Sequence, residues 1–434
     1  MNTIRNLDQK LVEWDALIKS GEGKLVKSEI AKMVVSNVPN RLIVKFADIC
    51  RRSESYDKGL FLLQGHLFRK GQFDYSQNNK LISSYCELLL KVNASQYAYK
   101  LINNKTLTVD ENIAYLRAVL GMVMWDIEGA RKNFESYLNF DIQDAYKKTI
   151  QLLNYASALA FLGEYEKCHY YLDEVIKVST TNSWKLLIGN ALESKGYVDM
   201  EQNELNRASE SLEQADIFLE ESNPRYKLFV SMWKALIELK KSPTSENAYN
   251  NLERIRNSAL EIGSWNSVRK IDMYASIFTK DIYKLQYVYA GSPYSQFQYK
   301  INSLFGKNVL EDNNYLLKYG NKPRYVLNIK NGTLTFHDNL LIEFTKTMKA
   351  LLSSLLKDFY RQPLIPQIFC EMYPDEYFNP NSSPRRVYVA TQRLRKAFEK
   401  NNVPLDIEIK GSKIRLIPKI SWEYFSIVLP LTYE

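Results

Sequence analysis

Residues 153–176, LNYASALAFLGEYEKCHYYLDEVI, contain the pattern that decides the fold of most of this chain. Ala156 and Leu159 fall on one face of a predicted helix, and Gly163 permits a turn after it. The small residue Cys168 then lets a second helix approach the first closely. The stretch therefore predicts a hairpin of two helices joined by a short turn.

Similar units lie on either side, around Gly121–Gly129 and around Gly189–Gly196, at a spacing of about 34–40 residues. The Gly-x-Tyr corner at residues 163–165 and the small residue that follows it resemble tetratricopeptide (TPR) repeats, although the usual final Pro is absent. The resemblance covers residues 110–220 most closely. It implies a TPR-like helical repeat domain over residues 1–310, and a non-repetitive helical bundle is the alternative.

Hairpins of this kind cannot bury their apolar faces alone, so they are expected to stack into an α-solenoid with a concave groove. Such a groove predicts a protein or peptide partner, and a homodimer is a further possibility. Tyr170 and Tyr171 either line the groove or pack between hairpins.

The periodicity changes in the last quarter of the chain. The polar segment 311–322, EDNNYLLKYGNK, predicts a linker between two domains. Residues 325–330 and 333–337 alternate with period 2 around Asn331-Gly332, which predicts a β-hairpin, and residues 339–342 form a candidate third strand.

Three helices and a second hairpin are expected next. The apolar positions predict helices from Lys346, over 366–373 and over 384–400, with Thr345 capping the first and Pro384 in the first turn of the last. Residues 405–409 and 414–417 then predict strands joined by a basic tip. The expected fold class is mainly α, with a TPR-like α-solenoid followed by a small α+β domain.

Residues 385–398, RRVYVATQRLRKAF, are similar to the recognition helix of the OmpR/PhoB-type winged helix-turn-helix proteins, which reads RTVDVHISRLRKKL. The resemblance implies a winged helix-turn-helix DNA-binding domain over residues 323–434, with a C-terminal tail. Tyr388 and Ala390 replace an acidic residue and a histidine of that family, so the base preference is expected to differ. Leu364 replaces the serine that usually caps the second helix.

The net charge agrees with this resemblance. The chain of 434 residues carries 58 Lys and Arg against 49 Asp and Glu, a net +9. Residues 385–419 alone hold ten basic and three acidic residues, a net +7, which suits a phosphate backbone. A solvated helix face is the other explanation of such a cluster.

The resemblance and the charge together suggest which side chains contact DNA. Base-edge contacts are expected from Arg386, Tyr388, Gln392 and Arg393. Contacts with the DNA backbone are expected from Arg385, Arg395, Lys396, Lys410 and Lys413. An ion pair inside the domain is the alternative for Arg395.

These observations favour a cytoplasmic bacterial transcriptional regulator that binds double-stranded DNA, with the array as a sensor, partner-binding or oligomerisation platform. Similar bacterial activators often carry the winged helix first. The alternative is a TPR-type scaffold or adaptor whose winged helix contacts protein. Cofactors, metal ions and membrane association are not expected. An enzyme is disfavoured, because the sequence has four scattered Cys, three His and no recognised catalytic motif.

Overall fold

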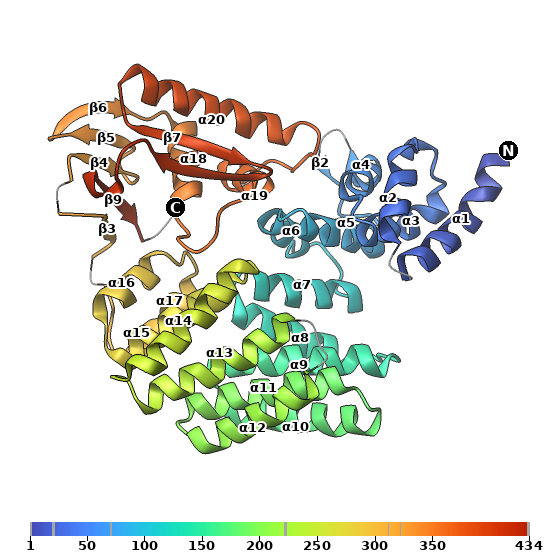
Figure 1. The fold of residues 1–434 in the computed structure, drawn as a ribbon. Helices are drawn as coiled ribbons and strands as arrows, with labels where there is room; N and C mark the ends of the chain where they lie inside the picture. The colour runs from blue at the N-terminus through green and yellow to red at the C-terminus, as the bar shows by residue number, and fades with distance from the viewer. Residues whose placement is uncertain are drawn as a thin grey trace.

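The protein is described by a computed structural model that covers residues 2–19, 22–69, 72–220, 224–310, 312–321 and 323–431. Figure 1 shows a curved series of helices followed by a smaller unit of strands and helices at the C-terminal end. The fold is therefore mainly helical with a small C-terminal α+β unit, as the sequence predicts.

The first part of the chain forms a group of short helices and a small hairpin, β1 (Phe68–Arg69) and β2 (Gln72–Phe73). The 3₁₀ turns Val35–Asn37 and Asn40–Leu42 precede the third helix. The helices are α1 (Asn2–Lys19), α2 (Gly23–Ala31), α3 (Ile43–Arg52), α4 (Tyr56–Leu67), α5 (Asn79–Lys91) and α6 (Ser95–Ile102).

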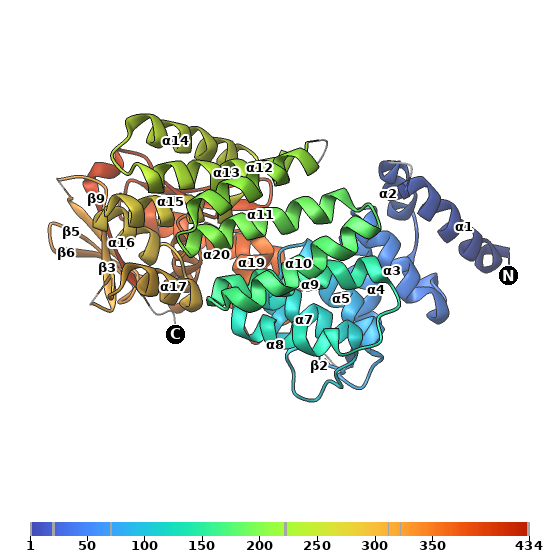
Figure 2. The same ribbon diagram turned by 90° about the horizontal axis from the view of Figure 1, so that it is seen from below.

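The middle of the chain forms stacked hairpins. From α7 to α16 each helix packs against the next, and α17 packs against α15. The helices α9, α11, α13 and α15 also pack side by side, so the first helices of successive hairpins form one layer (Figure 2). The helices are α7 (Glu111–Val123), α8 (Ile127–Leu138), α9 (Ala145–Leu162), α10 (Tyr165–Thr181), α11 (Lys185–Glu201), α12 (Leu205–Phe218), α13 (Pro224–Lys241), α14 (Glu246–Glu261), α15 (Trp265–Thr279), α16 (Ile282–Ala290) and α17 (Ser295–Phe305).

Glycine permits both the turns and the close packing. Gly163 ends α9 with a φ of 82°, a conformation that strains residues with a side chain. Gly196 of α11 faces α12 so closely that a Cβ there would lie 2.5 Å from Leu212 Cγ. The predicted helix–turn–helix units are confirmed, and their identity as TPR repeats stays a prediction.

The C-terminal unit has the predicted order of strands, three helices and a hairpin, although its larger sheet has five strands in the order β3-β9-β4-β5-β6. The strand β9 runs parallel to β4, and the other neighbouring pairs are antiparallel. The elements are β3 (Asn314–Lys318), β4 (Tyr325–Asn328), β5 (Thr333–Phe336), β6 (Asn339–Glu343), α18 (Lys346–Leu356), α19 (Ile365–Met372), α20 (Ser383–Lys400), β7 (Leu405–Lys410), β8 (Lys413–Pro418), a 3₁₀ turn (Trp422–Tyr424) and β9 (Phe425–Pro430).

Two strands of the larger sheet lie where the sequence predicts none, as do the short strands β1 and β2 of the helical region. The segment 311–322, predicted as a linker, contains β3, and the predicted C-terminal tail contains β9. In the sheet, Ile427 of β9 pairs with Leu317 of β3 on one side and with Leu327 of β4 on the other, and all three side chains are buried. These strands depend on partners about 100 residues away in the chain, and local periodicity does not report such pairing.

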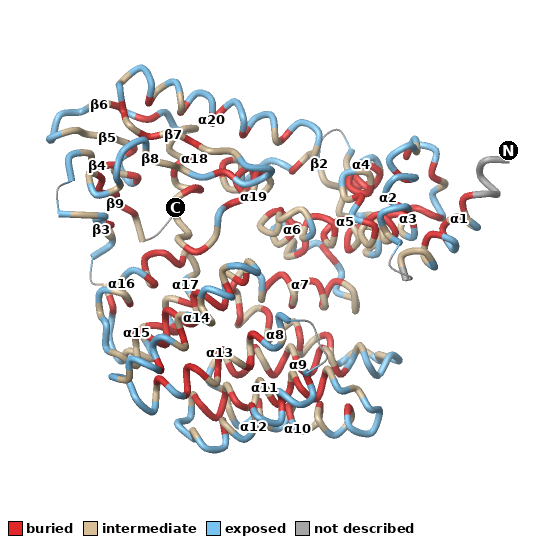
Figure 3. The backbone as a smooth tube through the Cα atoms, viewed as in Figure 1, coloured by how far each residue is buried: buried red, intermediate tan, exposed pale blue. Residues whose placement is uncertain are grey.

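The C-terminal unit does not stand apart from the array. One continuous cluster of buried residues runs from the N-terminal helices into the C-terminal unit, and a second begins at Ala118 of α7 and fills the later hairpins. Figure 3 colours the buried residues red along the backbone. At one contact, Gln64 Nε2 of α4 donates to the backbone oxygen of Phe378, 3.0 Å away. At another, the guanidinium of Arg269 in α15 binds both oxygens of Asp358 at 2.7 Å. The division into domains at residues 311–322 stays a prediction.

Candidate functional site

The helix α20 has one buried face and one exposed basic face. Val387, Ala390, Leu394 and Phe398 recur at helical spacing and are all buried, as the sequence predicts. In Figure 1, α20 lies on the side of the C-terminal unit that is away from the helices α9–α15. The surface expected to contact DNA is therefore open to solvent.

Eight of the nine residues predicted to contact DNA are exposed on this face or at the hairpin tip, and one of these eight, Arg386, is ion-paired. The other seven have no ion-pair partner in the described ranges. Tyr388 and Gln392 are two of these seven. The other five are basic: Arg385, Arg393, Lys396, Lys410 and Lys413.

The remaining two predicted residues contact groups of their own unit. The guanidinium of Arg386 pairs with both oxygens of Glu376 and lies over the Tyr373 ring, 3.9 Å from its centroid. The hydrogen bond from Arg386 holds the pKa of the Glu376 carboxyl below its usual value. Arg395 donates to Asp406 at 3.0 Å and to the Ile407 backbone oxygen. The pair with Asp406 is the ion pair inside the domain that was the alternative to a DNA contact for Arg395.

The hairpin of β7 and β8 is held beside the helices by backbone contacts. Leu364 forms an isolated antiparallel bridge with Lys413, and the Ile365 amide donates to the Ser412 oxygen at 2.9 Å. Gly411 turns the hairpin with a φ of 61°. The basic tip is consequently fixed relative to α19 and α20.

A second candidate site lies on the layer formed by the first helices of the hairpins. Tyr197 of α11 stacks on Trp233 of α13, with ring centroids 4.6 Å apart. The ammonium nitrogen of Lys270 in α15 lies 5.9 Å and 5.6 Å from these two rings. Glu193 accepts a hydrogen bond from Trp233 Nε1 at 2.5 Å.

These side chains border two adjoining cavities of about 490 Å³ and 220 Å³, which share Glu193, Trp233, Asn266 and Lys270. Burial lowers the pKa of Lys270 and raises the pKa of Glu193, because a charge is less well solvated in this site than in water. Lys270 has no hydrogen-bond or ion-pair partner among the residues that the structure describes. The array groove, as we name this site, therefore offers an ammonium group above two aromatic rings.

Sequence reasoning did not single out Glu193, Trp233 and Lys270 as binding residues. A signal was present, because Tyr197, Trp233 and Lys270 follow one another at intervals close to the predicted repeat length. The tyrosines that were singled out lie elsewhere, on α10. Tyr170 is 66% exposed, and Tyr171 packs against Tyr155 with centroids 5.0 Å apart. This contact is packing within the α9–α10 hairpin, whereas the packing alternative for Tyr171 was a contact between hairpins.

Neither a metal cluster nor a membrane-spanning helix is found within the ranges that the structure describes. No group of three or more His, Cys, Asp or Glu side chains in those ranges is arranged to hold a metal ion. No helix within them has the length and hydropathy that crossing a membrane requires.

Comparisons with known proteins give a similarity to solved structures and no match to a family model. No family model matches the chain, and no curated protein matches it. Among solved structures, the chain is similar to a Rap protein whose crystal structure was determined in complex with competence and sporulation factor. The alignment has 14% identity and a TM-score of 0.48, and covers 70% of this chain and 92% of the Rap chain.

Proposed function

We propose that this protein is a binding scaffold whose helical array holds a segment of a partner protein in the array groove. The observation that carries the proposal is Lys270, an ammonium group without a described partner above Tyr197 and Trp233 and beside an open cavity. A carboxylate or a backbone carbonyl of the partner would supply the missing acceptor.

A polypeptide segment suits this groove better than a compact ligand does. The bordering residues come from α7, α8, α9, α11, α13 and α15, so the site runs across several hairpins. An extended chain offers side chains and backbone polar groups at regular intervals, whereas a small molecule engages one cavity only. The proposal assigns no catalytic reaction to the protein.

Selection from a random peptide library displayed on phage, with the full chain as bait, tests this proposal. We expect enriched peptides with an acidic residue near an aromatic one, and Lys270→Gln should weaken their binding at least tenfold. Lys177→Gln is the matched control, because Lys177 is exposed on α10 and borders neither cavity. A failure to enrich peptides, or equal binding by Lys270→Gln and the parent chain, would refute the proposal.

We further propose, as a second function, that the C-terminal unit is a winged helix that binds duplex DNA through α20 and the β7–β8 hairpin. The supporting observation is specific: five exposed basic side chains on these elements have no ion-pair partner in the described part of the chain. Uncompensated cations on one face attract a phosphate backbone. The three arginines that are paired, Arg386, Arg395 and Arg415, support the unit itself.

A salt titration of binding to random-sequence duplex DNA separates this proposal from a protein-contact role. Replacing Arg393 and Lys396 with Ala should weaken binding and reduce the slope of log affinity against log salt by about 2. The matched control is Lys105→Ala with Lys177→Ala, two exposed lysines of the array. If the parent chain shows no salt-dependent binding, α20 is a protein-contact surface and the DNA proposal is wrong.

A further inference from the structure

A third cavity lies where the C-terminal unit meets the array, and no function above uses it. It has a volume of about 630 Å³, within the range of small-molecule sites. Its walls come from the turns before α6 and α8, from the start of α17, from the segment between α18 and α19, and from α19. We name it the junction cleft.

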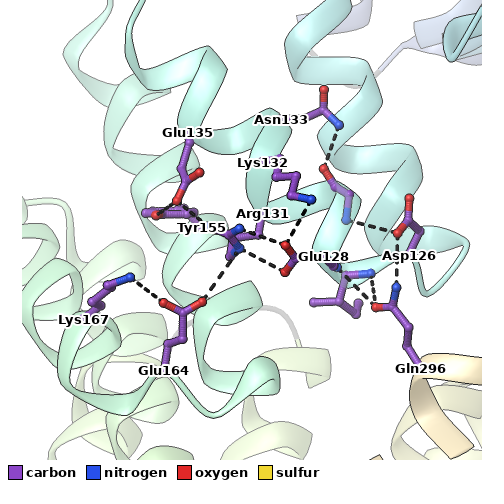
Figure 4. A network of polar contacts seen from close by, with 12 residues as sticks. Asp126, Glu128, Arg131, Lys132, Asn133, Glu135, Tyr155, Glu164, Lys167 and Gln296 are labelled. Carbon is purple, nitrogen blue, oxygen red and sulfur yellow. Dashed lines mark hydrogen bonds and ion pairs between the residues drawn. The ribbon is translucent and has the colours of Figure 1, made fainter. Parts of the chain in front are cut away.

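The walls of the junction cleft are held in place by polar contacts. Gln296 of α17 accepts from the Ile127 amide at 2.7 Å and donates to Asp126 at 3.2 Å, which fixes α17 to the start of α8 (Figure 4). The ion pair between Arg269 and Asp358 fixes the opposite wall. The cleft is thus built from anchored elements of both parts of the chain.

Two of the acidic groups that line the cleft are already satisfied. Asp358 accepts two bonds from Arg269 and one from the Tyr360 amide. Asp126 accepts from the Gly129 amide, from the Tyr99 hydroxyl and from Gln296. Neither carboxylate needs a ligand.

Three other lining groups are incompletely satisfied. The guanidinium of Arg361 makes one hydrogen bond, to Asn93 Oδ1 at 2.8 Å, and has no carboxylate within ion-pair distance among the described residues. The side chain of Glu371 is 8% exposed; Oε1 binds Lys357 at 2.8 Å, while Oε2 has no partner. Gln367 Oε1 is also buried without a partner.

These groups define the chemistry of a ligand. Arg361 can bind a carboxylate through two parallel hydrogen bonds. The open acceptors of Glu371 and Gln367 require N–H donors, and leaving them unsatisfied is unfavourable. The junction cleft also has an apolar part of its wall, formed by Val123, Met124 and Leu431.

We propose that the junction cleft binds an amino-acid-like zwitterion with an apolar side chain. Its carboxylate binds Arg361, its ammonium group binds Glu371 and Gln367, and its side chain lies against the apolar wall. Because the cleft is shared by the array and the C-terminal unit, the ligand stabilises the contact between them. The site is distinct from the array groove and from α20, so it does not depend on either function proposed above.

Thermal unfolding of the full chain with each of the twenty free L-amino acids tests the proposal. We expect leucine, methionine or phenylalanine to raise the melting temperature saturably. The single-charge analogues of leucine, 4-methylpentanoate and isoamylamine, should not raise it, because each lacks one of the two charged groups. Equal effects of leucine and its analogues, or no effect of any amino acid, would overturn the proposal.

Variants then test the assigned residues by calorimetric titration with the most effective amino acid. Arg361→Gln and the isosteric Glu371→Gln should each weaken binding at least tenfold. Gln96→Trp, which fills the cleft from α6 and alters neither charged group, should abolish binding. Lys330→Gln is the control, an exposed charge on the turn after β4. Unchanged affinity in all three cleft variants would place the ligand elsewhere and refute the assignment.

Discussion

A buried ion pair is one of the links between the array and the C-terminal unit, and Asp358→Asn should weaken this link severely. The side chains of Arg269 and Asp358 are 1% and 6% exposed, and both carboxylate oxygens lie 2.7 Å from Arg269 Nη2. The substitution keeps the shape of residue 358 but leaves the guanidinium without its opposing charge.

The expected loss follows from the burial of the guanidinium. Removing one partner of a buried ion pair costs about 3–5 kcal/mol, because the remaining charge is neither solvated nor neutralised. Four aromatic rings surround the Arg269 guanidinium at 5.0–5.9 Å and compensate for part of this cost: Trp125, Tyr294, Phe297 and Tyr360. We therefore expect Asp358→Asn to reduce the free energy of unfolding by about 3 kcal/mol.

Urea unfolding followed by tryptophan fluorescence measures this loss, since Trp125 lies 5.9 Å from the guanidinium. The control is Asp8→Asn, which breaks an ion pair with Arg41 whose side chains are 40% and 63% exposed. An exposed pair contributes about 0–1 kcal/mol, so this control should change stability little. If Asp358→Asn and Asp8→Asn cost the same to within about 0.5 kcal/mol, the reasoning about burial is wrong.

Three further predictions concern single positions. Gly196→Val should lower the melting temperature, because even a Cβ at this position would lie 2.5 Å from Leu212 Cγ, and overpacking costs about 1–3 kcal/mol. Arg386 lowers the pKa of Glu376, so their ion pair should persist at neutral pH and be lost as pH falls through that lowered pKa; Arg386→Gln should return the carboxyl titration, followed by NMR, to its usual range. Burial raises the pKa of the Cys168 thiol to about 12, so mass spectrometry should find it unalkylated by iodoacetamide at pH 8 until the chain unfolds.

Elements that depend on local pattern could be predicted from the sequence. The turn at Gly163 and the amphipathic face of α20, with Val387 and Leu394 buried, follow from helical spacing within a few residues. The strands β4, β5 and β6 follow from period-2 alternation and Asn331-Gly332.

A candidate site could be predicted from the sequence only where all of its residues lie on one helix or one hairpin. The basic residues of α20 share a helix, so their common exposure follows from periodicity. Lys270 and Trp233 come from different hairpins, and Arg361 comes from the loop before α19 whereas Glu371 lies within α19. Each meets its neighbours only after the array has stacked and the C-terminal unit has packed against it.

The sequence by itself determined a mainly helical chain of hairpins, a C-terminal unit of strands and helices, and a local net charge of +7 over residues 385–419. These properties follow from the spacing of hydrophobic residues and from the local charge, both of which depend on residues that are close together in the sequence. Only the tertiary structure decided that β9 enters the sheet between β3 and β4, that Asp358 neutralises Arg269, and that Arg386 is held by Glu376. Such contacts join segments whose separation in sequence bears no relation to their separation in space, so they arise only when the whole chain packs.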